Sequence, residues 1–263
     1  MRRGLAAVLL CVLVFAAGCS AIPGTGDGGE MSPGGDGSGG SDGTAESVPG
    51  VENGSLANGT VLLDTHVRTI TETGYAHYIA INGTTVRDGN VTEATQQKRT
   101  EVSAGAEEYL TQLIRSGESS ERYIVWGNRS VATQSAEVDG SAPQYQSIPP
   151  RSPENLAGRA LLDRRLSSEF EVVDVDERAD APAIVTMEVD ALPEDNDVFS
   201  EQEVSNIREY EARLVVDTEG RIHGYTGTAA LKTEGERTDY EFRLEMNSFE
   251  DPGVERPSWA TPE

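Results

Sequence analysis

Alternation between apolar and polar residues near the C-terminus constrains the fold more than any other feature of this sequence. The apolar positions are Tyr240, Phe242, Leu244 and Met246, and the residues between them are Glu, Arg, Glu and Asn. Successive side chains of a β-strand point to opposite faces, so a period of two predicts a strand with one buried and one solvated face. Tyr210 and Leu214 follow the same period in an earlier segment. We therefore expect these six residues on the apolar face of one sheet.

The C-terminal part of the chain is predicted to consist of consecutive strands. These are Phe170–Asp176, Ile184–Leu192, Glu209–Asp217, Arg221–Thr233 and Thr238–Phe249. Turn residues around Gly220 and Gly235 separate the last three segments. Short turns join antiparallel neighbours, so an antiparallel sheet is expected.

Upstream, apolar residues at helical spacing predict a helix over 60–72, and Ser152 followed by Pro153 predicts the start of a second helix over 153–167. Strands are expected at 75–85, which reaches a turn at Asn82-Gly83, and at 97–116, 123–126 and 130–138. The segment 143–153 contains several prolines and is expected to lack regular structure. The fold class is therefore α+β, a single antiparallel sheet with about two helices packed on one face.

The N-terminus has the pattern of a lipoprotein signal peptide. Arg2 and Arg3 precede an apolar stretch, Leu5–Ala17, which has the length of a signal-peptide core and is short for a bilayer span. The stretch leads to Gly18 and Cys19. Small residues before a cysteine resemble the lipobox of prokaryotic lipoproteins, although alanine stands where an aliphatic residue is usual. We expect residues 1–18 to be removed by cleavage between Gly18 and Cys19, and Cys19 to carry a lipid that anchors the chain to the outer side of the cell membrane.

Two alternatives stay open for this leader. It could be an ordinary secretory signal that happens to contain a cysteine, and the arginine pair leaves the choice between the general and the twin-arginine export route undecided. Removal of residues 1–18 takes away two arginines and no acid.

A low-complexity segment follows the leader. Of the 40 residues from Ser20 to Gly59, 13 are glycine, and most of the others are small or polar. Such a composition does not bury enough apolar surface to offset the entropy of ordering. The expected organisation is a signal peptide at 1–18, a disordered tether at 19–59 and one globular domain at 60–263.

Charge excludes one class of partner and suggests an environment. The chain has 45 Asp and Glu against 21 Lys and Arg, with lysine only at Lys98 and Lys232, and a net charge of −24. Binding to nucleic-acid phosphates needs clustered basic residues, so no nucleic-acid partner is expected. Acids spread along the whole domain, with few lysines, indicate adaptation to multimolar salt, where a hydrated acidic surface is screened. Recognition of a cationic partner is the alternative.

The sequence contains no recognised pattern for catalysis, metal binding or cofactor binding. His66, His77 and His223 lie on separate predicted elements and are expected at the surface or its boundary. There is neither a Gly-x-Ser-x-Gly elbow nor a phosphate-binding P-loop. The acidic run 194–197 lacks the spacing of a calcium loop and is expected to be solvated. The chain is therefore predicted not to be an enzyme and to hold no metal and no cofactor.

Five Asn-x-Ser/Thr triplets agree with an exported domain, because this pattern is the acceptor for N-glycosylation. The possible glycosylation sites are Asn53, Asn58, Asn82, Asn90 and Asn128.

Several short motifs together resemble a known group of proteins. They are the arginine-led leader, the Ala-Ala-Gly-Cys box, the Gly/Asp tether, the helix with His66, the Tyr75-x-x-Tyr78 strand, the segment 215–222 and Val254-x-x-Pro257-x-Trp259. The first three, with the acidic domain, resemble haloarchaeal surface lipoproteins. The order of the others, over about residues 56–260, is similar to an uncharacterised family of these lipoproteins, with a fold expected to be like the LolA/LppX/LprG carriers. The resemblance implies a curved antiparallel half-barrel with helices on its concave face, which binds lipids or acyl chains. No catalytic or ligand-contact residue comes with it.

Two functions follow from these observations. The first is a membrane-anchored extracellular carrier or sensor with a lipid-like ligand in an apolar cavity lined by the six residues of the alternating strands. The second is a non-catalytic structural or interaction module of the cell surface with a filled core. An inward apolar face serves both.

Overall fold

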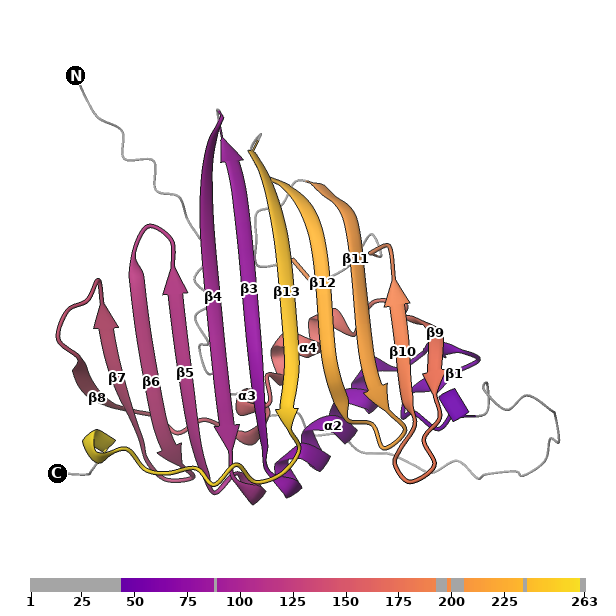
Figure 1. Cartoon of the computed structure of the whole chain (residues 1–263), viewed down its shortest axis with the longest axis horizontal. Coiled ribbons are helices and arrows are strands. Elements are labelled where there is room, and N and C mark those ends of the chain that lie inside the picture. Colours follow the sequence, from indigo (N-terminus) through magenta and orange to yellow (C-terminus); the bar gives the residue numbers. More distant parts are fainter. Residues whose placement is uncertain (1–43, 88, 193–197, 200–205, 234–235, 261–263) are drawn as a thin grey trace, which may run out of the picture. The chain divides into compact units, whose positions relative to one another are not determined.

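One antiparallel sheet dominates the computed structural model, which describes residues 44–87, 89–192, 198–199, 206–233 and 236–260. Its strand order in the described part of the chain is β1-β2-β9-β10-β11-β12-β13-β3-β4-β5-β6-β7-β8 (Figure 1). Every pairing is antiparallel and the sheet is open and curved, which confirms the predicted α+β half-barrel.

The strands before the second helical region are β1 (Val51–Glu52), β2 (Ser55–Leu56), β3 (Tyr75–Arg87), β4 (Asn90–Val102), β5 (Glu108–Ser116), β6 (Ser120–Asn128), β7 (Ala132–Val138) and β8 (Gln144–Ile148). Those after it are β9 (Glu171–Asp176), β10 (Ile184–Val189), β11 (Asn206–Asp217), β12 (Ile222–Thr233) and β13 (Glu236–Ser248). The pairing of β13 with β3 joins the two halves of the sequence at the centre of the sheet.

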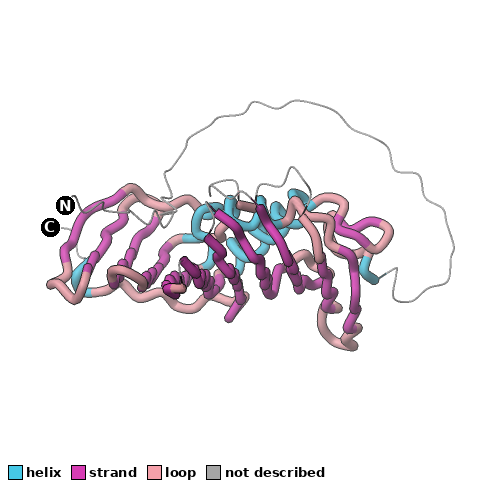
Figure 2. The backbone as a smooth tube through the Cα atoms, turned by 90° about the horizontal axis from the view of Figure 1, so that it is seen from above, coloured by secondary structure: helices cyan, strands magenta, loops and turns pink. Residues whose placement is uncertain are grey.

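Helices α2 (Gly59–Thr73), α3 (Pro153–Leu156) and α4 (Arg159–Arg165) lie on the concave side of the sheet (Figure 2). Asn58 caps α2 because its Oδ1 accepts a hydrogen bond of 3.1 Å from the N–H of Val61. Ser152 caps α3 as predicted. The single helix expected over 153–167 is two helices, because Gly158 adopts a left-handed conformation with φ 74°.

Three local predictions are wrong. Asn82 and Gly83 form no turn, since both pair with β4 and β13 and the strand continues to Arg87. The strand expected over 97–116 is the end of β4 and the whole of β5, separated by a short 3₁₀ turn. Residues 144–148 were expected to be irregular, but they pair with β7 as the edge strand β8. The prolines nearby do not prevent this pairing, because an edge strand tolerates proline.

The expected tether ends too late in the sequence. Residues 44–59 belong to the fold: Ala45, Val48, Val51 and Leu56 are buried in the core, and the N–H of Leu56 donates to the carbonyl of Phe170. The high glycine content of this segment predicted disorder, but its few apolar residues are buried in or next to the edge strands β1 and β2. The predicted signal peptide and residues 19–43 of the tether lie outside the described residues.

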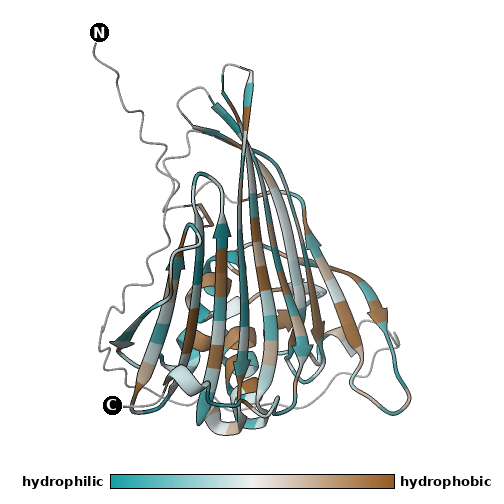
Figure 3. Cartoon of the chain, turned by 60° about the vertical axis from the view of Figure 1, so that its left-hand side comes forward, coloured by the Kyte–Doolittle hydropathy of each residue, from teal (hydrophilic) through white to brown (hydrophobic). Residues whose placement is uncertain are grey.

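Apolar and polar bands alternate along the strands, as the sequence period requires (Figure 3). Apolar residues of the concave face and of the helices form one continuous core. The segment after β13 runs along the lower edge of the sheet in the view of Figure 1. Its Arg256 guanidinium lies 4.4 Å from the ring centre of the buried Trp126 of β6. None of the helices in the described residues is both long and apolar enough to cross a bilayer.

Candidate functional site

The structure brings the six predicted apolar-face residues onto the concave side of the sheet. Tyr210 and Leu214 come from β11, and the other four come from β13. Strand β12 lies between them, so that Leu214 pairs with Tyr225 and Tyr225 pairs with Leu244, which in turn pairs with Ile79 of β3. One apolar row therefore crosses four adjacent strands beneath the helices.

This row is part of a filled core in the structure. Leu214, Phe242 and Leu244 are at most 1% exposed, and Tyr210 is 5% exposed. The remaining two predicted residues, Tyr240 and Met246, are half-buried and pack against the same core. The predicted residues thus meet on one face and contact protein atoms, and of the six only Tyr240 also lines one of the two depressions described below.

Tyr225 belongs to this site and was missed by the sequence analysis. Its hydroxyl lies 2.8 Å from that of Tyr210, and its ring contacts Phe170 and Phe242 edge to face. Burial raises the pKa of both tyrosines, so both phenols stay neutral at physiological pH. Tyr225 alternates with glycine and threonine on β12, which is a weak signal for an apolar face.

A buried arginine stands within the apolar part of the concave face. Arg165, at the end of α4, is 5% exposed, and its guanidinium lies 3.8 Å from the ring centre of Phe242. Its Nη1 donates to the carbonyl of Leu161, and its Nη2 donates to the hydroxyl of Tyr240 at 2.9 Å. All three groups are uncharged. This role could not be predicted from the sequence, because an arginine near the C-terminal end of a helix is typical of an exposed residue that interacts favourably with the helix dipole.

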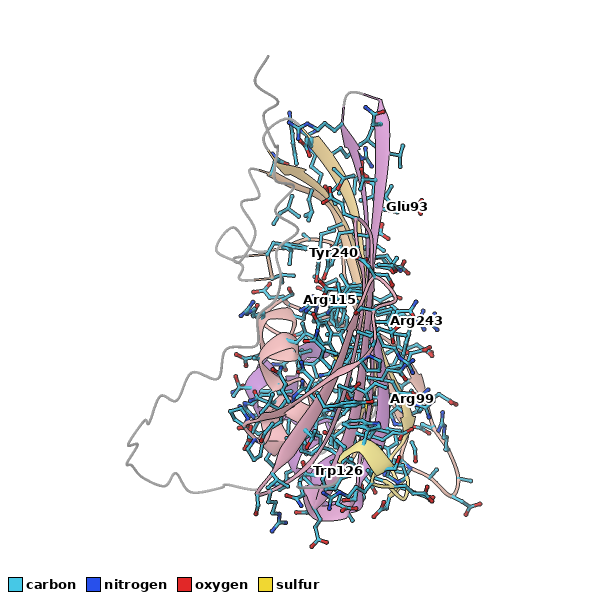
Figure 4. The ribbon with its side chains drawn as sticks, turned by 90° about the vertical axis from the view of Figure 1, so that its left-hand side faces the viewer. Glu93, Arg99, Arg115, Trp126, Tyr240 and Arg243 are labelled. Atoms are coloured by element: carbon cyan, nitrogen blue, oxygen red, sulfur yellow. The ribbon has the colours of Figure 1, made fainter. Side chains whose placement is uncertain are left out.

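The two faces of the sheet differ in character. Figure 4 shows Tyr240 and Arg115 on the side that carries the helices, and Glu93, Arg99 and Arg243 on the opposite side. On the helix side, Arg115 Nε donates to Gln96 at 3.0 Å and pairs with Glu121 at 3.4 Å. The concave face is therefore apolar on β10–β13, whereas β4 and β5 also contribute polar side chains such as Gln96 and Arg115.

Two depressions lie on the convex face. One has a volume of about 460 Å³ and carries Glu209, Glu211, Asp239 and Glu241 among its lining residues. The other, of about 940 Å³, runs over β9–β12. Both are acidic and solvated, and Arg237 pairs with Glu209 and Asp239 at the rim of the first. Such exposed pairs contribute little to stability or binding.

Two of the three histidines, which were expected at the surface or its boundary, are buried instead. His66 and His77 are buried, at 1% and 0% exposure. His223 is partly exposed and its Nε2 lies 2.9 Å from Asp217, which is buried and also pairs with Arg221. Burial acts to raise the pKa of Asp217, but the hydrogen bonds from His223 and Arg221 outweigh it and lower the pKa. Within the described residues, no His, Cys, Asp or Glu side chains cluster as metal ligands would.

The remaining predicted positions are distributed as follows. Cys19, Gly18 and the acidic run 194–197 lie outside the described residues. The possible glycosylation sites fall into two groups: Asn53, Asn58 and Asn90 are exposed, and Asn82 and Asn128 are half-buried.

No family model matches the chain, and no curated protein is similar to it in sequence. Among solved structures it is similar to a DUF1329 family protein from Desulfovibrio piger, with 13% identity over 74% of this chain and 93% of that chain and a TM-score of 0.27. It is similar to a putative outer membrane lipoprotein-sorting protein domain from Vibrio parahaemolyticus, with 10% identity, 76% and 96% coverage and a TM-score of 0.27. A LolA superfamily protein from Nitrosomonas europaea gives 12% identity, 71% and 92% coverage and a TM-score of 0.23. Identity and TM-score are low in each case, so the function proposed for this chain rests on its own geometry.

Proposed function

We propose that this protein binds an apolar, lipid-like ligand on the concave face of its half-barrel. The observation that carries the proposal is the apolar row Leu214–Tyr225–Leu244–Ile79, which crosses four strands under a cover of three separate helices. A helical cover can separate from an open sheet without breaking any strand pairing. The row then offers an acyl chain a continuous apolar surface, which is the main source of affinity for such ligands.

Polar contacts between the cover and the sheet support this arrangement. Helix α2 is linked to β12 through His66 and the N–H of Ile222, and α4 is linked to β13 through Arg165 and Tyr240. Each contact is a single hydrogen bond between a helix side chain and one atom of the sheet, so it can break without disturbing the pairing of the strands. A ligand that enters between the layers would exchange apolar contacts for apolar contacts and leave the strand ladder intact.

The second candidate is a structural or interaction module of the cell surface with a permanently filled core. The exposure of at most 1% at Leu214, Phe242 and Leu244 favours it, because a carrier without ligand often retains empty space. The two candidates differ in whether the helical cover ever separates from the sheet. Both are non-catalytic, and neither assigns chemistry to the Asp217–His223 pair, which is held by Arg221 at a turn.

The site of action is proposed from the sequence pattern. A lipid on Cys19 would anchor the mature chain to the cell membrane on its extracellular side, and residues 20–43 would separate the domain from the headgroups. An export signal, an acidic domain and several Asn-x-Ser/Thr triplets agree with this location and with a halophilic source.

Native mass spectrometry tests the proposed function. The chain with Cys19→Ser, expressed in a halophilic host and purified in multimolar KCl, carries no covalent lipid. Any extra mass that disappears when the same sample is denatured therefore belongs to a bound molecule and not to a glycan. The proposal expects an adduct of lipid mass that organic solvent extracts and identifies. Protein that shows only its own mass and binds no fluorescent acyl probe would favour the filled-core module.

A further inference from the structure

A patch of polar side chains interrupts the core on the concave face of β3, β4 and β5. His77, Thr100 and Thr111 are direct cross-strand neighbours in one row, and Lys98 lies next to Thr100 on the same face of β4. All four are buried, with exposures between 0% and 7%. We name these four residues the polar patch.

Most polar atoms of this patch have no hydrogen-bond partner in the described part of the chain. The unpaired atoms are the two ring nitrogens of His77 and the hydroxyl oxygens of Thr100 and Thr111. The hydroxyl of Tyr75 also has no partner there, and the centre of its ring lies 5.6 Å from that of His77 in a stacked arrangement. Buried polar atoms in folded proteins are nearly always paired, and each exception needs an explanation such as a bound molecule. Several exceptions that adjoin one another point to one shared partner.

The patch has a positive electrostatic character in a strongly acidic chain. Lys98 is one of only two lysines in a sequence of net charge −24. Arg151, in the segment before α3, acts on Lys98 as a like charge, and burial together with this charge lowers the pKa of Lys98 to about 7. An anion would accept from the unpaired hydroxyl donors of the patch and be attracted by the cations Lys98 and Arg151.

The patch continues directly into the apolar row. Lys98 pairs with Ile79, Ile79 with Leu244, Leu244 with Tyr225, and Tyr225 with Leu214. Neighbouring strands lie about 4.8 Å apart, so the row from Lys98 to Leu214 spans roughly 19 Å. One end of the row is basic and hydroxylated, and the rest is aliphatic and aromatic. This order of groups matches an amphiphile with an anionic head.

We propose that the polar patch binds the anionic head of the ligand, a carboxylate or a phosphate, while the acyl chain lies along Ile79, Leu244 and Leu214. This inference rests on the proposed function and specifies its ligand class. The patch is closed in the structure, because its unpaired atoms have no access to solvent, and beside it the N–H of Arg151 donates to the hydroxyl of Tyr109 at 3.0 Å. Binding therefore requires Arg151 and its neighbours between β8 and α3 to separate from Tyr109.

Competition binding tests the inference. The full mature chain in multimolar KCl is loaded with a fluorescent acyl probe, which is then displaced by a 16-carbon fatty acid, the matching fatty alcohol or a 16-carbon lysophosphatidate. We expect the acid or the lysophosphatidate to displace the probe at least tenfold better than the alcohol. The better of the two anions identifies the head as carboxylate or phosphate.

Variants locate the effect. Lys98→Met keeps approximately the length of the side chain and removes its charge. It should abolish the preference for the anionic ligand over the alcohol. The affinity for the alcohol should stay within about twofold of that of the unmodified chain. Lys232→Met removes the other lysine, which is exposed on β12, and should change nothing. Thr100→Val is a second variant that removes a donor without removing charge, and should reduce the preference in part.

Three outcomes are distinguishable. Equal displacement by acid and alcohol from the unmodified chain, or a preference that survives in both Lys98→Met and Thr100→Val, would overturn the head-group site and leave the proposed carrier function standing. Failure of every probe to bind would remove the carrier function, and the head-group site with it. A preference lost in Lys98→Met and kept in Lys232→Met would establish the inference.

Discussion

His66 Nδ1 on helix α2 accepts a hydrogen bond of 3.0 Å from the backbone N–H of Ile222 on β12, 156 positions further along the chain. This bond requires a neutral imidazole with an unprotonated Nδ1. Burial lowers the pKa of His66 from 6.5 to about 3, and the nearby Asp217 opposes the shift only in part. The contact between the helical cover and the sheet is therefore sensitive to acid.

Stability is expected to fall as the pH is lowered from about 6.5 to about 3, because the unfolded chain binds a proton at His66 that the folded chain rejects. The slope from one such group reaches about 1.4 kcal/mol per pH unit. His66→Asn retains an acceptor near the position of Nδ1 and does not titrate. Urea unfolding of both chains across this pH range measures the effect, and the difference between the two curves should grow towards low pH. Parallel curves would show that His66 is protonated in the folded state.

Arg165 and Tyr240 should be energetically coupled. Tyr240→Phe leaves a buried donor of Arg165 without its acceptor, which typically costs about 1–3 kcal/mol. Arg165→Met removes that donor, so Tyr240→Phe should cost much less in the Arg165→Met background. A double-mutant cycle by urea unfolding in multimolar KCl measures the coupling, expected at about 0.5–3 kcal/mol. Additive effects of the two substitutions would mean that the bond contributes nothing to stability.

Lipidation at Cys19 has a direct test. Cys19→Ser should remove the lipid adduct and move the protein from the membrane fraction to the medium or to an uncleaved precursor. Mass spectrometry of the N-terminal peptide and fractionation of the cells provide the measurement. Cys11→Ser, which changes the cysteine inside the leader, is the matched control and should behave like the unmodified chain. A Cys19→Ser protein that stays in the membrane at the mature mass would contradict the lipoprotein signal.

Folding should depend on salt. The net charge of −24 becomes −26 when residues 1–18 and their two arginines are removed, and in dilute buffer this charge repels itself over about 10 Å or more, whereas 1 M salt reduces the range to about 3 Å. The melting temperature should rise steeply between dilute and multimolar KCl. Sucrose at matched osmolality stabilises without screening charge and should give a smaller increase. A melting temperature independent of KCl would exclude the halophilic interpretation.

The sequence predicted those parts of the fold where local pattern and tertiary environment agree. Strand β13 alternates strictly, and its register places Phe242 and Leu244 in the core as expected. The polar patch could not be predicted, because Lys98 and Thr100 stand in a polar stretch that reads as a solvated strand. The groups that lie near the patch come from distant parts of the chain, His66 of α2 near His77 and Arg151 near Lys98, and no local pattern announces them. Burial of His77 was missed for the same reason.

The substitution Leu244→Trp distinguishes a carrier from a filled-core module. Leu244 lies at the middle of the apolar row and is 1% exposed. If the helical cover separates from the sheet to admit a ligand, the indole ring of the new tryptophan occupies the space of the acyl chain. We then expect at least a tenfold loss of affinity for a fluorescent acyl probe, with little change in melting temperature. In a core that never opens, the same overpacking typically costs about 1–3 kcal/mol.

Arg243→Trp is the matched control, because it places the same ring on the convex face of the same strand, where Arg243 is half exposed. Loss of its exposed ion pair with Glu245 should cost at most about 1 kcal/mol, and probe binding should not change. Fluorescence titration and thermal melts of the three chains in multimolar KCl are therefore read together. The carrier predicts that affinity falls only in Leu244→Trp. A chain that binds no probe and is destabilised by Leu244→Trp alone would show instead that the concave face is a permanent core and that the function lies on the outer surface.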